Sequence, residues 1–247
     1  SGEPPVYVPA LDLVAKDKGE IAHGHCRALG STPVMCTYGD LASGNTVALV
    51  GDSHALQWGP PLIQLAEQRD WRLIVFIKTG CLIADFRFNS ECDAWRNQVV
   101  GSIAAQHPQH VIVGTSTGRR YSLVTTDGRK LTRHESNRRL ARGFTRTFKR
   151  LKAIPGLMGD GTGLTLIRDQ NTAPFLPSKC LADNPRHPER CRFPHKRKFL
   201  PGVDLLAAKR AKIMPVIDPL EALCDPNWCY ASRDNVVIYR DSDQIGR

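Results

Sequence analysis

The chain has 247 residues, with 34 Lys and Arg against 24 Asp and Glu, and a formal net charge of +10. Apolar residues make up 41% and charged residues 23%, which excludes a disordered tail and a fibrous protein. No apolar run approaches the roughly 18 residues that span a bilayer. We therefore expect a soluble part of a longer protein.

Along the chain, two residue patterns predict the elements of an α/β domain. Residues 1–45, rich in Pro, Gly and small polar residues, are expected to form an N-terminal extension before a domain over 46–247. Short apolar runs typical of buried parallel strands occur at 46–50, 72–78, 110–113, 164–167, 214–218 and 236–239. Helical spacing occurs at 55–69 (interrupted by Pro60 and Pro61), 94–106, 133–152 and 203–210. This alternation predicts a doubly wound, flavodoxin-like, mostly parallel sheet of about five strands.

The eight cysteines fall into four close pairs, which favours four local disulfides. These would be Cys26–Cys36, Cys81–Cys92, Cys180–Cys191 and Cys224–Cys229, although eight cysteines allow about 105 pairings. A zinc site is the competing interpretation, but the tight CxxC knuckles of such sites are absent. Disulfides indicate an oxidising, extracytoplasmic compartment, and we expect neither metal nor cofactor.

Positive charge is concentrated in one stretch of the chain. Between Arg119 and Lys152 there are twelve Lys or Arg, opposed only by Asp127 and Glu135. No nucleic-acid-binding motif accompanies them, so we expect no nucleic-acid partner. Anionic lipid head groups or an envelope glycan are favoured over nucleic acid as partners, and a plain solvated helix face is the simplest interpretation of the stretch. The helix over 133–152 is expected to bury Leu140, Phe144 and Leu151 and to turn its arginines outward.

A serine follows the first predicted strand, in Gly51-Asp52-Ser53-His54. Ligands of doubly wound sheets bind beyond the carboxyl ends of the strands, so this serine lies where a nucleophile would be expected. The other interpretation is a plain helix N-cap.

The segment 47–58 (VALVGDSHALQW) resembles the first block of the SGNH hydrolase superfamily, in the form fused to acyltransferase-3 membrane proteins. The resemblance continues through 78–81 (KTGC), the Pro-rich loop that ends in Cys180, the segment 218–229 and 239–243 (YRDSD). It implies an extracytoplasmic domain that passes acyl groups, often acetyl, to hydroxyls of cell-surface carbohydrate. Its partners would be the membrane acyltransferase-3 domain of the same polypeptide and the carbohydrate acceptor, and we expect a monomer.

The resemblance also implies roles for individual residues. Ser53 would be the nucleophile, and its own N–H and that of Gly80 would bind the oxyanion. Ser116 stands where the family usually has an asparagine side chain for the third oxyanion contact. Asp241 matches the aspartate of the Asp-x-x-His block, but Gln244 stands at the position of the histidine. Glutamine does not titrate near neutral pH and cannot serve as the general base.

Three explanations of Gln244 follow from this departure: replacement of a natural histidine, natural impairment, or rescue by another histidine. His54 is expected to have a structural or acceptor-binding role rather than that of a base, and Trp228 is the best-placed aromatic for stacking on a sugar. The sequence therefore predicts an envelope O-acyltransferase domain. The alternatives are a carbohydrate esterase and a non-catalytic glycan- or lipid-binding module with a decayed site.

Overall fold

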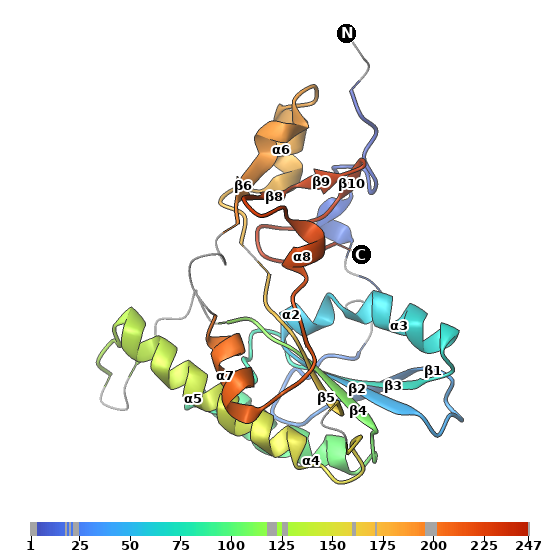
Figure 1. The fold of residues 1–247 in the computed structure, drawn as a ribbon, viewed down its shortest axis with the longest axis vertical. Coiled ribbons are helices and arrows are strands. Elements are labelled where there is room, and N and C mark those ends of the chain that lie inside the picture. The colour runs from blue at the N-terminus through green and yellow to red at the C-terminus, as the bar shows by residue number, and fades with distance from the viewer. Residues whose placement is uncertain are drawn as a thin grey trace.

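The computed structural model describes residues 4–17, 19, 21, 25–117, 123–124, 128–159, 162–170, 172–195 and 202–246. Its centre is a six-stranded sheet in the order β1-β3-β2-β4-β5-β7 (Figure 1). The strands are β1 Met35–Gly39, β2 Thr46–Gly51, β3 Arg72–Ile77, β4 His110–Gly114, β5 Leu164–Ile167 and β7 Val216–Ile217. All neighbours are parallel except β1, which pairs antiparallel with β3. The predicted α/β class is confirmed, and the sheet has one strand more than the five expected.

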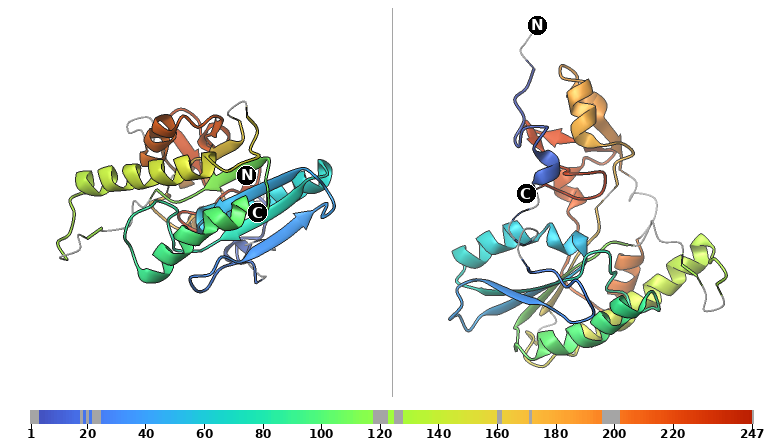
Figure 2. Two further views of the ribbon diagram at one scale, coloured as in Figure 1. Left: turned by 90° about the horizontal axis from the view of Figure 1, so that it is seen from below. Right: turned by 180° about the vertical axis from the view of Figure 1, so that it is seen from behind.

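Helices cover both faces of this sheet. Helices α4 Ser90–Ala104, α5 Arg133–Lys152 and α7 Val203–Ala211 pack on one face, and α2 Ser53–Leu56 and α3 Gly59–Gln68 pack on the other (Figures 1 and 2). Strand β2 contributes side chains to both faces. Ala48 and Val50 belong to the core under α4, α5 and α7, and Val47 and Leu49 belong to the core under α2 and α3. Successive side chains of a strand point to opposite faces, so a fully apolar strand is buried on both sides.

Helix α5 has the bounds predicted from the sequence. Thr132 caps it in a capping box with Glu135, in which each side chain accepts a hydrogen bond from the other residue's backbone N–H. The expected apolar side chains are buried, together with Phe148. The arginines point outward as predicted, while Arg119 and Arg120 of the basic stretch lie outside the described residues.

The predicted helix over 55–69 is divided at its prolines. Helix α2 ends at Leu56, and α3 begins at Gly59 with Pro60 in its first turn, where a missing N–H is tolerated. Other boundaries shift by a few residues. For example, α4 begins at Ser90 because the Asn89 side chain accepts a hydrogen bond from the Cys92 N–H at 2.8 Å.

A smaller lobe lies beyond the carboxyl ends of the strands (Figure 1). Besides its loops it contains η1 Val14–Lys16, α6 Pro177–Asp183, η2 Pro188–Cys191, β6 Arg192–Pro194, α8 Leu220–Leu223, β8 Trp228–Tyr230, β9 Ser232–Arg233 and β10 Val236–Val237. The last strand was predicted to run to Tyr239 within the domain, but β10 is shorter and pairs with β9 outside the main sheet. Two small cores hold the lobe together, and Tyr7 and Val14 from the N-terminal segment belong to one of them.

The four disulfides have the predicted pairing. Two of them lie in the main domain and two in the smaller lobe. The division into an extension and a domain stays a prediction. Residues before 46 nevertheless take part in both parts of the fold. They form β1 of the main sheet, and the Val8 carbonyl accepts a hydrogen bond from the Val237 N–H at 2.9 Å. In the part of the chain that the structure describes, no helix has the length and apolarity needed to cross a membrane.

Candidate active site

Ser53 lies on the tight turn between β2 and α2, at the carboxyl edge of the sheet. Gly51 makes this turn possible, since its φ is 153° and a Cβ there would lie 1.7 Å from the Gly114 carbonyl oxygen. Gly114 in turn leaves room for Ala55, whose Cα would be 2.8 Å from a Cβ at that position. The chain therefore brings α2 directly over the ends of β2 and β4, with Ser53 half-buried at its first residue.

Asp52 is buried beneath this turn and joins it to the loop after β4. Its carboxylate accepts hydrogen bonds from the His54 N–H at 2.8 Å, the Thr115 hydroxyl at 2.8 Å and the Ser116 N–H at 2.9 Å. Burial raises the pKa of the Asp52 carboxyl, although these three donors and the charge of His54 oppose the rise. Asp52 thus fixes the backbone of His54, next to Ser53, and the backbone of Ser116 in the loop after β4.

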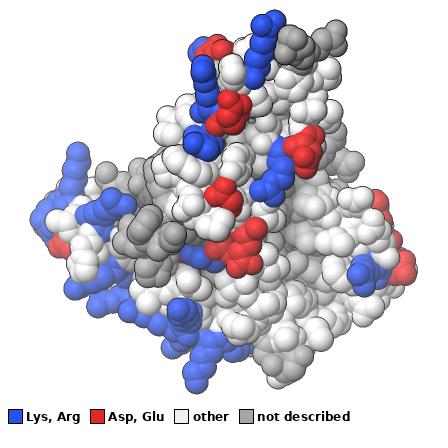
Figure 3. Space-filling view, turned by 45° about the horizontal axis from the view of Figure 1, so that its top comes forward, with Lys and Arg blue, Asp and Glu red and all other residues white. Residues whose placement is uncertain are grey.

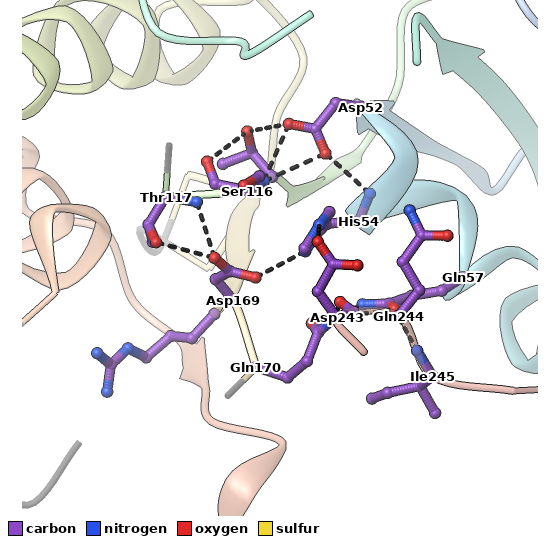
Figure 4. Close-up of polar contacts among 12 residues, drawn as sticks. Asp52, His54, Gln57, Ser116, Thr117, Asp169, Gln170, Asp243, Gln244 and Ile245 are labelled. Carbon is purple, nitrogen blue, oxygen red and sulfur yellow. Dashed lines mark hydrogen bonds and ion pairs between the residues drawn. The ribbon is translucent and has the colours of Figure 1, made fainter. Parts of the chain in front are cut away.

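His54 connects α2 to the loop after β5. Its Nδ1 lies 2.7 Å from Asp169 Oδ1, and its Nε2 lies 4.0 Å from Asp243 Oδ2 (Figure 4). The second oxygen of Asp169 accepts hydrogen bonds from the Thr117 N–H at 2.8 Å and the Thr117 hydroxyl at 2.9 Å. The imidazole is therefore held between two carboxylates and is itself buried.

These carboxylates decide the charge of His54. Burial lowers the pKa of the imidazole, but the hydrogen bond to Asp169 and the charges of Asp169, Asp52 and Asp243 together raise it to about 9. The pKa of Asp169 is lowered: burial favours its neutral form, and the bonds from His54 and Thr117 outweigh that effect. At neutral pH His54 is thus an imidazolium, which has no lone pair to accept a proton from a serine hydroxyl. The structural or acceptor-binding role predicted for His54 requires no proton acceptor, and it stays a prediction.

A pair of glutamines extends the network to the C-terminal segment. The Gln57 amide donates to Gln170 Oε1 at 2.8 Å, and Gln57 Oε1 accepts the Ile245 N–H at 2.8 Å. Gln170 donates a hydrogen bond to the Asp243 carbonyl. Residues on either side of Gln244 are therefore bound to the C-cap residue of α2 and to the loop after β5 (Figure 4).

Asp241 forms the turn that carries Gln244. Its Oδ1 accepts the N–H groups of Asp243 at 3.0 Å and Gln244 at 2.8 Å, and the Gln244 carbonyl accepts the Arg240 N–H at 2.9 Å. Asp241 Oδ2 lies 3.4 Å from the Arg240 guanidinium. The catalytic roles assigned to Ser53, Asp241 and Gln244 stay predictions.

The predicted oxyanion residues follow β3 and β4 at the same edge of the sheet. Gly80 lies on the exposed turn after β3 with φ 72°, a conformation that favours glycine. Ser116 follows β4, and its N–H is committed to Asp52. Among the described residues, no three His, Cys, Asp or Glu side chains are grouped so as to hold a metal ion.

Trp228, the predicted sugar platform, lies in β8 of the smaller lobe. The Arg192 guanidinium lies over its ring, 4.5 Å from the centroid. One face of the indole is therefore covered within the lobe itself.

The site also contains five residues to which the sequence motifs assign no role: Thr117, Asp169, Gln57, Gln170 and Asp243. Asp169 and Gln170 could have been found, because they come just after a predicted strand, where ligand-binding residues of such sheets gather. The pairing of Gln57 with Gln170 depends on tertiary structure alone.

Comparisons with known proteins agree with this architecture. The structure is similar to that of the periplasmic domain of a lipopolysaccharide acetyltransferase from Salmonella ser. Paratyphi A, with a TM-score of 0.63 and 14% identity. That match covers 97% of this chain and 92% of the other, and at this identity it shows the fold alone. A search of curated proteins finds no match. The model of the SGNH domain fused to AT3 domains matches residues 16–243, and the chain therefore belongs to that family.

Proposed function

We propose that this SGNH domain works outside the cytoplasm with an AT3 membrane domain and passes an acyl group to a hydroxyl of envelope carbohydrate, and that this group is acetyl, as the name of the structural neighbour suggests. The observation that carries the proposal is the position of Ser53 on the glycine-dependent turn at the carboxyl edge of β2. The four disulfides support an oxidising compartment.

The transfer would take two balanced steps at Ser53. In the first, Ser53 Oγ bonds to the acyl carbonyl carbon, the bond to the donor's leaving group breaks, and the serine proton goes to that group. In the second, the acceptor hydroxyl attacks the acyl-serine ester, the ester bond breaks, and the hydroxyl proton returns to Ser53. Each step develops an oxyanion, which the N–H groups of Ser53 and Gly80 would stabilise by several kcal/mol.

Both steps also require a group that moves a proton, and this requirement limits the rate. Gln244 cannot titrate, and His54 is already protonated at neutral pH. We therefore expect slow transfer with Gln244 in place. Gln244 also supports the second candidate function, a glycan- or lipid-binding module that retains the fold without a working base.

The basic face of α5 supports a position beside an anionic membrane surface. This face consists of the exposed residues Arg133, Arg138, Arg142, Arg146, Lys149, Arg150 and Lys152. Lys and Arg gather on the side of the molecule that carries α5, whereas acidic residues are scattered elsewhere among basic ones (Figure 3). A face of this kind attracts anionic head groups, with a strength that falls as salt increases.

Acylation of Ser53 tests the proposal directly. The protein is incubated with p-nitrophenyl acetate, and peptide mass spectrometry then locates the added acetyl group. We expect slow accumulation on Ser53, faster accumulation in Gln244→His, and none at this position in Ser53→Ala. Absence of the adduct from Gln244→His would overturn the transferase and favour the binding module.

A further inference from the structure

A groove runs between α3 and the C-terminal segment, next to the network that holds Gln244. Its volume is about 460 Å³, within the range of small-molecule sites, and its lining includes Trp58, Pro60, Pro61, Gln64, Glu67 and Ile245. The Ile245 N–H donates a hydrogen bond to Gln57, which holds the C-terminal segment beside the junction of α2 and α3.

The lining combines apolar surface with polar groups that the protein leaves unused. Trp58 is half-buried and Pro60 is beside it, so an indole ring and pyrrolidine rings form the wall. Gln64 and Glu67 are exposed one turn apart on α3. Within the described part of the chain, the side chains of Trp58, Gln64 and Glu67 have no hydrogen-bond or ion-pair partner.

We propose that this groove is the subsite for a sugar ring of the acceptor glycan, and that the ring is a neutral one. A pyranose ring has an apolar C–H face that would lie against Trp58 and the prolines, and peripheral hydroxyls that match an amide and a carboxylate. Among the lining residues that the structure describes, Glu67 alone carries a charge, and its negative charge opposes an acidic sugar. Trp228, by contrast, has a ring face already covered by Arg192.

The groove is connected to the proposed nucleophile by one helical turn. Gln57 belongs to the groove lining and to the active-site network, and Ser53 precedes it by four residues. Four residues of helix rise about 6 Å and return to the same face. A ring in the groove would therefore place a neighbouring part of the glycan near Ser53, and in this respect the inference rests on the proposed function.

Binding can be measured without turnover by using Ser53→Ala protein and the four indole N–H resonances of its tryptophans. The probe is a neutral oligosaccharide, prepared by base de-O-acylation and mild acid hydrolysis of the source cell's own envelope polysaccharide. We expect titration to shift the Trp58 resonance to saturation, with no shift for Trp95, which is fully buried. Trp58→Ala should weaken binding about tenfold or more, equivalent to roughly 1.4 kcal/mol.

Matched variants separate a binding role from loss of structure. Gln68→Ala changes an exposed α3 residue outside the groove lining and should leave the affinity unchanged, while Gln64→Ala and Glu67→Gln change exposed α3 residues of the lining and should each weaken binding several-fold. No Trp58 shift at 50 mM sugar, or tighter binding of an oligouronate than of the neutral probe, would overturn the inference. Sugar binding at Trp58 without acetylation of Ser53 would overturn the proposed acyl transfer and support the sugar site in the groove. Acetylation of Ser53 without sugar binding would support acyl transfer and overturn the sugar site.

Discussion

Replacement of His54 by glutamine should change how the stability of the protein depends on pH. The pKa of His54 rises from 6.5 to about 9 on folding, because the bond to Asp169 and the surrounding carboxylates outweigh burial. A raised pKa in the folded state gives stability that is complete below the unfolded pKa, and that is lost as pH rises through the folded pKa. The difference of about 2.5 units, at 1.36 kcal/mol per unit, corresponds to roughly 3 kcal/mol.

Urea denaturation followed by tryptophan fluorescence measures this effect at pH 6 to 9.5. In the parent protein, the free energy of unfolding should fall between pH 6.5 and 9 by about 1.4 kcal/mol per pH unit, because only the folded state then keeps the proton. His54→Gln should abolish this part of the slope. His134→Gln, which changes an exposed histidine of α5, should preserve it. Parallel curves for the parent protein and His54→Gln would refute the account of His54 as an imidazolium held by Asp169 and Asp243.

Three further predictions concern the base, the basic face and the buried ion pairs. Gln244→His should raise the hydrolysis of p-nitrophenyl acetate by two orders of magnitude or more, and Asp241→Asn in that background should remove most of the gain, as steady-state assays would show. Binding to vesicles that contain anionic lipid, measured by flotation, should fall as salt rises from 50 to 300 mM, and it should be weaker in the double variant Arg142→Gln/Arg150→Gln. Equal binding to neutral vesicles would contradict the role of the basic face of α5. Arg168→Met should lower the free energy of unfolding by about 3 kcal/mol or more. The reason is that Asp204 at 3.3 Å and Asp218 at 2.6 Å lose their cation, and Asp204 is fully buried. A urea midpoint of unfolding within error of the parent's would count against this prediction.

The elements of the main sheet could be predicted because their patterns are local. Strands β2, β3, β4 and β5 are continuous apolar runs, as expected for parallel strands covered on both faces. The helix predicted over 133–152 coincides with α5, because its apolar positions repeat at helical spacing. The structure adds the capping box of Thr132 and Glu135, which fixes the start of the helix.

Strand β1 and the smaller lobe could not be predicted in the same way. Residues 35–39 (MCTYG) are partly exposed at the sheet edge, and they form a strand because β3 supplies the pairing and Cys36 is tied to Cys26. The strands of the lobe have only two or three residues, too few to show a periodicity. Their conformation depends on disulfides and contacts between segments distant in the sequence.

The candidate site was predictable to the extent that it depends on motif residues. Ser53, Gly80, Ser116 and Asp241 were named from the sequence, but the partners that fix their surroundings come from other strands. The contact of His54 with Asp169 joins residues 115 positions apart. The position of Asp169 after a strand makes it a candidate, but nothing near either residue in the sequence shows that the two side chains meet.

The contacts around Gln244 make its substitution a test of chemistry rather than of folding. The Gln244 N–H is held by Asp241, its carbonyl accepts the Arg240 N–H, and the flanking Ile245 N–H is held by Gln57. None of these bonds uses the Gln244 side chain, so a histidine there would begin from the same fixed backbone. If Gln244→His keeps the parent's unfolding midpoint but gains no activity, the transferase proposal fails and the binding module is favoured. If it gains activity, the missing base alone limits this domain.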